Sequence, residues 1–242
     1  MKVGSVDKIN ALIQWENLVL QYQKLGVEVE FIDQIENHPD MVFAADQSLL
    51  LGEKHILLSS FRFPERRGES EQYLTWYLDH GYQVTTLPED LYFEGGGELQ
   101  PWQHYLFIGV GFRTDHPSAR HIGEVFGKEV LCLELSKEHF YHLDTCLMAL
   151  DDRTVFYYPP AFSPASQKAL QDLVPNLLEI SEAEVQNFAA NSVVIEKSVL
   201  MQVGSPVMAA QIEKLGYRVI SLDVSEFMKA GGGLHCLTGY LS

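Results

Sequence analysis

One junction recurs five times along this chain of 242 residues. At each junction an amphipathic stretch ends at a glycine or a proline, and an apolar segment with strand-like alternation follows. Neighbouring junctions stand 41 to 55 residues apart, an interval typical of propellers and solenoids. The five junction residues are Gly26, Gly81, Gly127, Pro175 and Gly216. Because one such unit cannot bury its own apolar face, the pattern predicts an α/β fold of five units around a pseudo-symmetry axis.

The starts of the helices are marked as well as their ends. Ser163-Pro164 and Ser205-Pro206 each place a capping hydroxyl before a proline at the first helical position. A further helix is expected over residues 8–25, with one apolar stripe that packs against a sheet. The stripe consists of Ile9, Leu12, Ile13, Val19 and Leu20.

Composition limits the partners of this fold. The hydrophobic content of 46% is enough for one sizeable core, so we expect a single domain over residues 1–242. The formal net charge of −16 repels phosphate backbones and anionic membranes, which argues against nucleic acid as a partner. Three cysteines without paired spacing, and no targeting or membrane-spanning segment, are typical of a cytoplasmic protein. Whether the chain forms a homo-oligomer is left open.

A cysteine stands close behind a run of three glycines in the segment Gly231-Gly232-Gly233-Leu234-His235-Cys236. A backbone without side chains lets another molecule approach closely, so Cys236 is a candidate nucleophile. The alternative is a small buried hydrophobe in a final strand.

The unusual polar residues follow the junctions at similar offsets. Asp46, Glu94, His142 and Cys236 stand 13 to 20 residues behind four of the junctions. Units arranged around an axis would bring these positions together at the centre. Cys236, His142 and Glu94 have the composition of a nucleophile, a general acid/base and an orienting carboxylate. Glu94, next to three glycines, could equally be a turn carboxylate.

Two aspartates are candidates for binding a cation. The apolar run Met41–Asp46 is expected to be a buried strand that ends in an acid, and in His142-Leu143-Asp144 a strand would place both polar side chains on one face. Asp46 and Asp144 could then grip a planar cation, for which the fork of a guanidinium is suited. Asp46 could instead merely open the next turn.

The arginines are less decisive. Arg113 follows an expected strand over residues 105–110 and could clamp a substrate carboxylate, or form a surface ion pair. Arg66 and Glu69, three residues apart near a helix start, are expected to be a structural pair. Cys132 and Cys146 are expected in the core. No metal-ligand pattern is found, and no cofactor is implied.

Four segments together resemble one superfamily: residues 93–98 (FEGGGE), 111–114 (GFRT), 141–145 (YHLDT) and 226–232 (EFMKAGG) with Cys236 behind them. They are similar to the guanidine-modifying amidinotransferase superfamily, and within it to dimethylarginine dimethylaminohydrolases and bacterial arginine dihydrolases. The resemblance runs nearly end to end. It implies a five-bladed α/β propeller, the pentein fold.

The resemblance also implies roles. Cys236 matches the nucleophile, His142 the acid/base and Glu94 the triad carboxylate. Asp46 and Asp144 match guanidinium-binding acids, and Arg113 matches a substrate-binding arginine. The implied activity is hydrolysis of a C–N bond in arginine or an arginine derivative, through a covalent thiouronium intermediate and without a metal or organic cofactor.

The chain departs from the resemblance at two points. The opening strand with an Asn-Pro element is expected to be missing, since Met1 leads almost directly into the first helix. Dihydrolase relatives tend to have asparagine where this chain has Asp46, which favours a single hydrolysis. Two other functions stay open: an amidinotransferase, in which an amine replaces water, and a non-catalytic binding module of the same fold.

Overall fold

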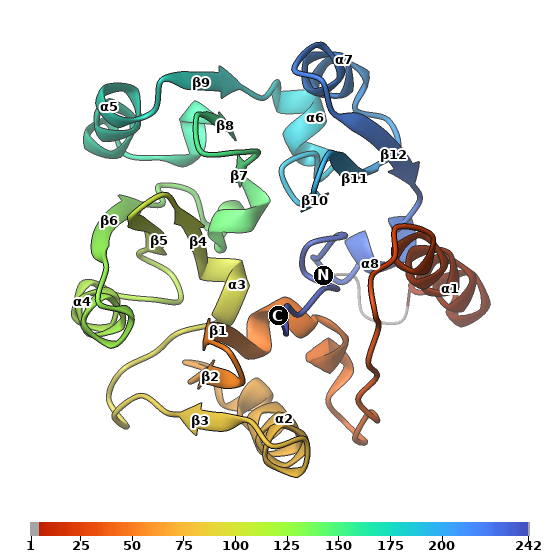
Figure 1. Cartoon of the computed structure of the whole chain (residues 1–242), viewed down its shortest axis with the longest axis vertical. Helices are drawn as coiled ribbons and strands as arrows, with labels where there is room; N and C mark the ends of the chain where they lie inside the picture. Colours follow the sequence, from red (N-terminus) through yellow and green to blue (C-terminus); the bar gives the residue numbers. More distant parts are fainter. Residues whose placement is uncertain (1–4, 242) are drawn as a thin grey trace.

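The elements of the protein follow one another around a central axis, as a computed structural model shows (Figure 1). The structure describes residues 5–241. Five longer helices lie at the rim of this ring (Figure 1). The rim helices are α1 (Lys8–Lys24), α2 (Arg67–Asp79), α4 (His116–Phe126), α5 (Pro164–Leu173) and α7 (Pro206–Lys214).

Four of the units contain a sheet of three strands. In each sheet the first two strands pair antiparallel, the chain then passes through a rim helix, and the third strand pairs parallel to the second. The sheets are β1 (Ser48–Gly52), β2 (His55–Leu58) and β3 (Gln83–Thr85); β4 (Leu99–Trp102), β5 (Tyr105–Val110) and β6 (Glu129–Glu134); β7 (Leu147–Ala149), β8 (Thr154–Tyr157) and β9 (Asn176–Glu179); and β10 (Val193–Ile195), β11 (Ser198–Gln202) and β12 (Arg218–Leu222).

Short helices connect the sheets to the centre of the ring. The α-helical ones are α3 (Gly95–Glu98), α6 (Glu182–Gln186) and α8 (Ser225–Met228). The 3₁₀ helices are η1 (Pro39–Val42), η2 (Ala44–Gln47), η3 (Pro64–Arg66), η4 (Glu138–Phe140), η5 (Leu143–Thr145) and η6 (Pro159–Ala161).

The middle strand of each sheet carries the core. Leu57 in β2, Phe107 in β5, Phe156 in β8 and Leu200 in β11 are all fully buried. A strand with a partner on each side and a rim helix over it has no solvent-facing surface, which explains its near-continuous apolar sequence. Each such side chain contributes about 1.5–3 kcal/mol by leaving water.

The predicted junctions mark the ends of the rim helices. Gly127, for example, has φ of +61° directly after α4, and its N–H and that of Lys128 satisfy the last carbonyls of the helix. Gly81, Pro175 and Gly216 likewise precede β3, β9 and β12. The α/β fold and four of the predicted units are therefore confirmed.

The fifth unit differs from the other four. Gly26 follows the end of α1 with a φ of +77°, as expected for the glycine that stops a helix. Within the described residues, however, no strand follows it over residues 27–35. The expected strand is wrong here, because the segment has no neighbouring strand to pair with and an unpaired strand is not stable. The expectation that the opening strand is missing concerns the start of the chain, where residues 1–4 lie outside the described residues.

The predicted inner face of α1 is also wrong. Ile9 and Leu12 are 73% and 54% exposed, whereas Gln14, Leu18 and Tyr22 are buried. Gln14 fixes this orientation because its side chain donates to the side chains of Asp223 and Ser225 and accepts from the Glu226 N–H. The helix contacts β12 and α8 through the face that carries Gln14, Leu18 and Tyr22, and the predicted apolar stripe faces outward.

Candidate active site

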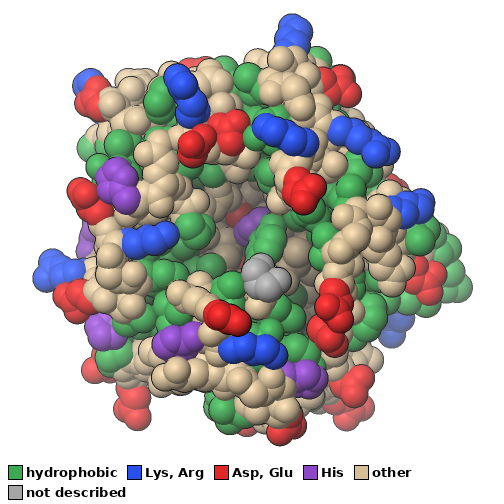
Figure 2. All heavy atoms as spheres, in the orientation of Figure 1, with side chains coloured by type: hydrophobic (Ala, Val, Ile, Leu, Met, Phe, Trp, Pro, Cys, Tyr) green, Lys and Arg blue, Asp and Glu red, His purple; other side chains and the backbone are tan. Residues whose placement is uncertain are grey.

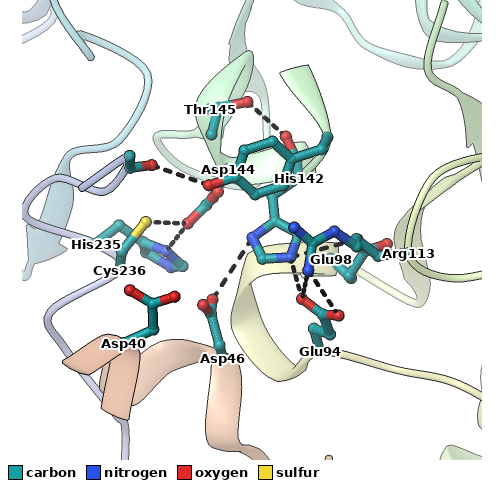
Figure 3. Close-up of polar contacts among 12 residues, drawn as sticks. Asp40, Asp46, Glu94, Glu98, Arg113, His142, Asp144, Thr145, His235 and Cys236 are labelled. Carbon is teal, nitrogen blue, oxygen red and sulfur yellow. Dashed lines mark hydrogen bonds and ion pairs between the residues drawn. The ribbon is translucent and has the colours of Figure 1, made fainter. Parts of the chain in front are cut away.

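The six predicted site residues converge near the axis of the ring. Cys236, His142, Glu94, Asp46 and Asp144 are each at most 3% exposed, and the side chain of Arg113 is 21% exposed. Figure 2 shows a depression at the centre of one face, with histidine and acidic side chains at its floor. In the close-up, Asp46 and Asp144 point into the space between Cys236 and His142 (Figure 3). The structure thus brings together residues that stand up to 190 positions apart in the chain.

Asp46 lies in a 3₁₀ helix and does not end a strand as predicted. Pro39 begins η1, and η2 follows directly, where the Asp46 N–H donates to the Phe43 carbonyl at 3.2 Å. The Ala45 N–H donates to the Cys236 carbonyl at 3.0 Å. This bond ties the aspartate segment to the cysteine segment and turns Asp46 toward the axis.

The segment of His142 and Asp144 is also a 3₁₀ helix, η5, and the predicted strand is wrong. The His142 carbonyl accepts hydrogen bonds from the Thr145 hydroxyl at 2.6 Å and from the Thr145 N–H at 3.3 Å, which closes the turn. Such side-chain caps compete with strand pairing. Both polar side chains nevertheless reach the same space, as the strand reading required.

His142 is held by the carboxylate of Glu94. The Nε2–H of His142 donates to Glu94 Oε2 at 2.8 Å, and Arg113 Nη1 donates to both Glu94 oxygens at 3.0 Å. The other ring nitrogen, Nδ1, faces Asp46 Oδ1 at 3.7 Å. Glu94 therefore orients the imidazole so that Nδ1 is presented to the centre of the site.

The charges of this pair reinforce each other. Burial disfavours the imidazolium, but the carboxylates of Asp46, Glu94 and Glu98 outweigh it and raise the pKa of His142 to about 9. Burial would raise the pKa of Glu94, but the hydrogen bond and charge of His142, with Arg113, lower it to about 2. At neutral pH His142 is a cation and Glu94 an anion.

Cys236, in contrast to His142 and Glu94, is uncharged. Its Sγ lies 3.2 Å from Asp144 Oδ2 and 3.1 Å from Asn191 Nδ2. Burial raises the pKa of this thiol well above its usual range, and the carboxylates of Asp144 and Asp46 raise it further. In the site without a ligand the thiol is therefore protonated and donates to Asp144.

Arg66 holds Asp46 through the oxygen that does not face His142. Its Nη1 donates to Asp46 Oδ2 at 2.7 Å, and its Nη2 donates to Glu69 Oε2 at 2.8 Å. The predicted pair of Arg66 and Glu69 is present, and it is fully buried and extends to the site. Burial raises the pKa of Asp46, while the charges of His142 and Arg66 act against the rise.

In each aspartate one carboxylate oxygen accepts no hydrogen bond from a described residue. Asp46 Oδ2 is bound to Arg66, and Asp144 Oδ2 accepts from Cys236 and His235. The second oxygens, Asp46 Oδ1 and Asp144 Oδ1, are buried and have no hydrogen-bond partner among the described residues. Buried polar atoms without partners are uncommon in native proteins, so two of them beside one thiol indicate acceptors for a ligand.

The glycines of the site are explained by packing within the chain. A Cβ on Gly97 would lie 2.7 Å from both Asp46 Oδ1 and His142 Nδ1. A Cβ on Gly232 would lie 2.3 Å from the ring of Phe43, and one on Gly233 would lie 2.8 Å from Asn191 Oδ1. The glycine run before Cys236 is thus filled by Phe43 and Asn191, and the expectation that it admits another molecule is wrong.

Three site residues escaped the sequence interpretation. Glu98 is fully buried, with Oε1 3.7 Å from His142 Nε2, and burial raises its pKa to about 8. Asn191 contacts the thiol and donates toward the Asp144 carbonyl at 3.4 Å. His235 Nδ1 lies 3.0 Å from Asp144 Oδ2. Glu98 closes the quoted FEGGGE segment, and His235 precedes the cysteine, so these two had a signal; Asn191 had none.

Arg113 makes no surface ion pair. It is bound to Glu94, and its guanidinium carbon lies 4.7 Å from the ring centres of both Phe63 and Tyr141. Only its Nη1 donates to a described residue. Its other N–H groups could donate to a substrate carboxylate, and that predicted contact stays a proposal.

Within residues 5–241 no group of three or more His, Cys, Asp or Glu side chains is arranged to hold a metal ion. In the same range no helix is long and apolar enough to cross a membrane.

The arrangement of these side chains agrees with the families and proteins that the sequence resembles. Residues 3–241 match the family described as N,N dimethylarginine dimethylhydrolase, eukaryotic. The chain belongs to this family. It is 39% identical to the N(G),N(G)-dimethylarginine dimethylaminohydrolase of Mycobacterium tuberculosis, over 96% of this chain and 76% of that protein. It is 34% identical to the bifunctional arginine dihydrolase/ornithine cyclodeaminase ArgZ of Synechocystis sp., over 97% of this chain and 34% of that protein.

Solved structures agree with this membership. The N-terminal domain of ArgZ covalently bound to a reaction intermediate superposes with a TM-score of 0.93 at 34% identity, over 98% of this chain and 88% of that one. A dimethylarginine dimethylaminohydrolase superposes with a TM-score of 0.84 at 27% identity, over 98% and 91%. These relatives are hydrolases of guanidino compounds, so the predicted enzyme class and the branch of the superfamily are confirmed.

Proposed function

We propose that this protein hydrolyses a C–N bond in the guanidinium group of arginine or an arginine derivative. The observation that carries the proposal is the pair of buried carboxylate oxygens without a hydrogen-bond partner, Asp46 Oδ1 and Asp144 Oδ1, on the two aspartates that point into the space between Cys236 and His142 (Figure 3). The relatives named above, dimethylarginine dimethylaminohydrolases and arginine dihydrolases, support the same substrate class.

The charge of the site favours a planar cation. Guanidinium offers N–H groups on two edges, so one edge can donate to Asp46 Oδ1 and another to Asp144 Oδ1. Hydrogen bonds between ionised partners are about twice as strong as neutral ones. The same positive charge offsets the repulsion of the two carboxylates that keeps the Cys236 thiol protonated in the empty site.

The first half of the reaction forms a thiouronium. Substrate binding lowers the pKa of the thiol, whose proton is released, and the Cys236 thiolate attacks the central guanidinium carbon. A C–S bond forms, the C–N bond to the leaving amine breaks, and His142 Nδ1, already protonated, gives its proton to that nitrogen. Glu94 keeps the imidazole oriented.

The second half returns the enzyme to its starting state. His142, now neutral, accepts a proton from a water molecule as the water attacks the thiouronium carbon. The C–S bond then breaks, the electron pair returns to sulfur, and the hydroxyl proton of the tetrahedral intermediate passes to the thiolate, so that a neutral ureido product leaves and the thiol is restored. Arg113, bound to Glu94 through Nη1 only, is the candidate to bind a substrate carboxylate with its remaining N–H groups.

The site supports a single hydrolysis. After one round the product of arginine is a neutral ureido compound, whose carbonyl oxygen needs a hydrogen-bond donor. An ionised Asp46 only accepts, while an asparagine would donate from its amide. We expect Asp46→Asn to convert arginine partly to ornithine, carbon dioxide and two ammonia molecules, whereas the unchanged enzyme stops at citrulline. Quantifying both amino acids by mass spectrometry checks this.

The first experiment incubates the protein with arginine, methylated arginines and agmatine, and measures citrulline, urea, ammonia and methylamines. Product that is lost in Cys236→Ala supports the proposal, and no product from any compound contradicts it. Turnover that requires an added amine acceptor would indicate an amidinotransferase instead. Equal labelling of all three cysteines by a haloacetamidine would indicate a binding module.

We propose further that α1 and the segments beside it form the fifth blade of a pentein propeller. Helix α1 occupies the fifth position on the rim (Figure 1). Hydrogen–deuterium exchange over α1 tests this, because a helix packed as part of a blade on β12 and α8 is protected and a detached helix is not.

A further inference from the structure

His235 lies at the thiol side of the site, directly before the nucleophile. Its Nδ1 is 3.0 Å from Asp144 Oδ2, and its side chain is 13% exposed (Figure 3). Gly96 packs beside the ring, since a Cβ there would lie 3.5 Å from His235 Cε1. The imidazole is therefore confined between Gly96 and Asp144.

Asp144 Oδ2 has two neighbours that compete for its negative charge. One is the thiol of Cys236 at 3.2 Å, and the other is the imidazole of His235. A carboxylate oxygen only accepts hydrogen bonds, so Nδ1 of His235 carries the proton in this contact. The other oxygen, Asp144 Oδ1, stays free for the substrate.

This contact bears on the reactivity of sulfur. The charges that act most strongly on the Cys236 thiol are the carboxylates of Asp144 and Asp46; Tyr141 also acts on it, and the imidazolium of His142 lies across the site (Figure 3). A thiolate formed beside Asp144 faces the negative charge of Oδ2, and every hydrogen bond donated to that oxygen disperses the charge. Asn191 Nδ2 donates to the sulfur itself, so His235 is the donor that acts on the carboxylate.

We propose that His235 is a positioning residue for the nucleophile. By donating to Asp144 Oδ2 it weakens the repulsion between this carboxylate and the Cys236 thiolate, and it keeps Asp144 Oδ1 turned toward the guanidinium. The inference rests on the proposed function and deepens it, because it assigns a residue that tunes the same site.

The experiment measures thiolate formation without a substrate. Cys236 is alkylated with neutral iodoacetamide over a range of pH in the wild type, His235→Leu and His235→Asn, and labelling is read for each cysteine by mass spectrometry. Asparagine places an N–H donor near the position of the imidazole Nδ1, and leucine has no donor. We expect His235→Leu to react about tenfold more slowly at a fixed pH, with its profile displaced to higher pH, since one hydrogen bond to a charged group is lost. His235→Asn should restore most of the rate.

Two controls separate this role from a structural one. His104→Leu, at an exposed histidine in the turn between β4 and β5, should leave the profile unchanged. If His235→Leu does not fold, His235→Asn is compared with His235→Gln, whose donor lies one bond further out; we expect only the glutamine variant to shift the profile.

Equal alkylation profiles for the wild type and the donor-free variant, or for the asparagine and glutamine variants, would overturn the inference. Because alkylation needs no guanidino compound, it still reports on His235 if the protein turns over none of the substrates tested. Failure of the proposed function and failure of this inference are thus distinguishable.

Discussion

The two sides of the active site differ in how completely their charges are balanced. On the histidine side, formed by His142, Glu94 and Arg113, every charged group has an opposite partner within 3.0 Å. On the thiol side, formed by Cys236, Asp144 and Asp46, two carboxylates act on a protonated thiol, and each keeps one oxygen without a hydrogen bond from a described residue. One side is organised before substrate arrives, and the other needs a cation to complete it. Hydrogen-bond donors and charges that are fixed before the reaction stabilise a developing charge without having to reorganise, and the histidine side has this property.

The largest effect should come from removing the proposed nucleophile on the thiol side. We expect Cys236→Ser to lower turnover about 10⁴-fold or more, because a serine hydroxyl between carboxylates has no base to ionise it. Thermal unfolding should change little, since the two side chains are similar in size. Cys132→Ser, at a half-buried cysteine in β6, is the matched control and should keep full activity. Measurable turnover by the serine variant would contradict the comparison.

The next effect tests the balance of the histidine side. Glu94→Gln removes the partner that keeps His142 protonated, so the pKa of His142 should fall below its value of about 9. The alkaline limb of kcat/KM, which reports loss of the imidazolium acid, should then move to lower pH, and kcat should fall about 10²–10⁴-fold. The exposed Glu124→Gln serves as control. An alkaline limb that stays in place would show that Glu94 does not set the charge of His142.

A third variant should act with opposite sign in two assays. Asp144→Asn removes a negative charge beside the thiol, so alkylation of Cys236 by neutral iodoacetamide should become roughly tenfold faster at pH 8. Guanidinium binding loses one carboxylate, so kcat/KM for the substrate should fall by roughly 10- to 100-fold. Both rates falling together would mean that Asp144 does not oppose the thiolate.

The smallest effect is on stability. Burial raises the pKa of Glu98 from its ordinary 4.5 to about 8, so the folded state holds a proton that the unfolded chain releases above pH 4.5. The stability that this group contributes is present below pH 4.5 and is lost as the pH rises through about 8. Glu98→Gln lacks this loss, so its Tm relative to wild type should rise by roughly 10 °C between pH 5 and pH 8.5. The exposed Glu213→Gln should show no such trend.

The residues that sequence reasoning predicted and those it missed differ in what determines them. Gly127 or Ser163 acts on its own few neighbours, so helix ends could be predicted from local conformation. The inner face of α1 could not, because a polar contact of Gln14 with residues more than 200 positions away overrides the apolar stripe. The 3₁₀ turns of Asp46 and Asp144 depend on packing at the axis in the same way.

The site residues also divide into those set by a local sequence pattern and those set by contacts between distant segments. Cys236, His142 and Glu94 stand in segments with a recognisable order of residue types, and the repeat explained why they meet. Asn191, 45 positions before the cysteine, has no pattern around it and is defined only by its contact with sulfur. The pairing of Arg113 with Glu94 was likewise missed, because an arginine can reach many partners and only coordinates decide among them.

The hydrogen bond between the Ala45 N–H and the Cys236 carbonyl joins segments that are synthesised far apart in time. Asp46, Glu94, His142 and Asp144 all leave the ribosome before the cysteine, the last of them by 92 residues. A nascent chain that has formed its first units holds the acids and the histidine without the sulfur, and contacts of such sequence separation form late in folding. In the proposed mechanism, chemistry on a guanidinium therefore becomes possible only when the ring has closed and has brought the sulfur to the acids and the histidine.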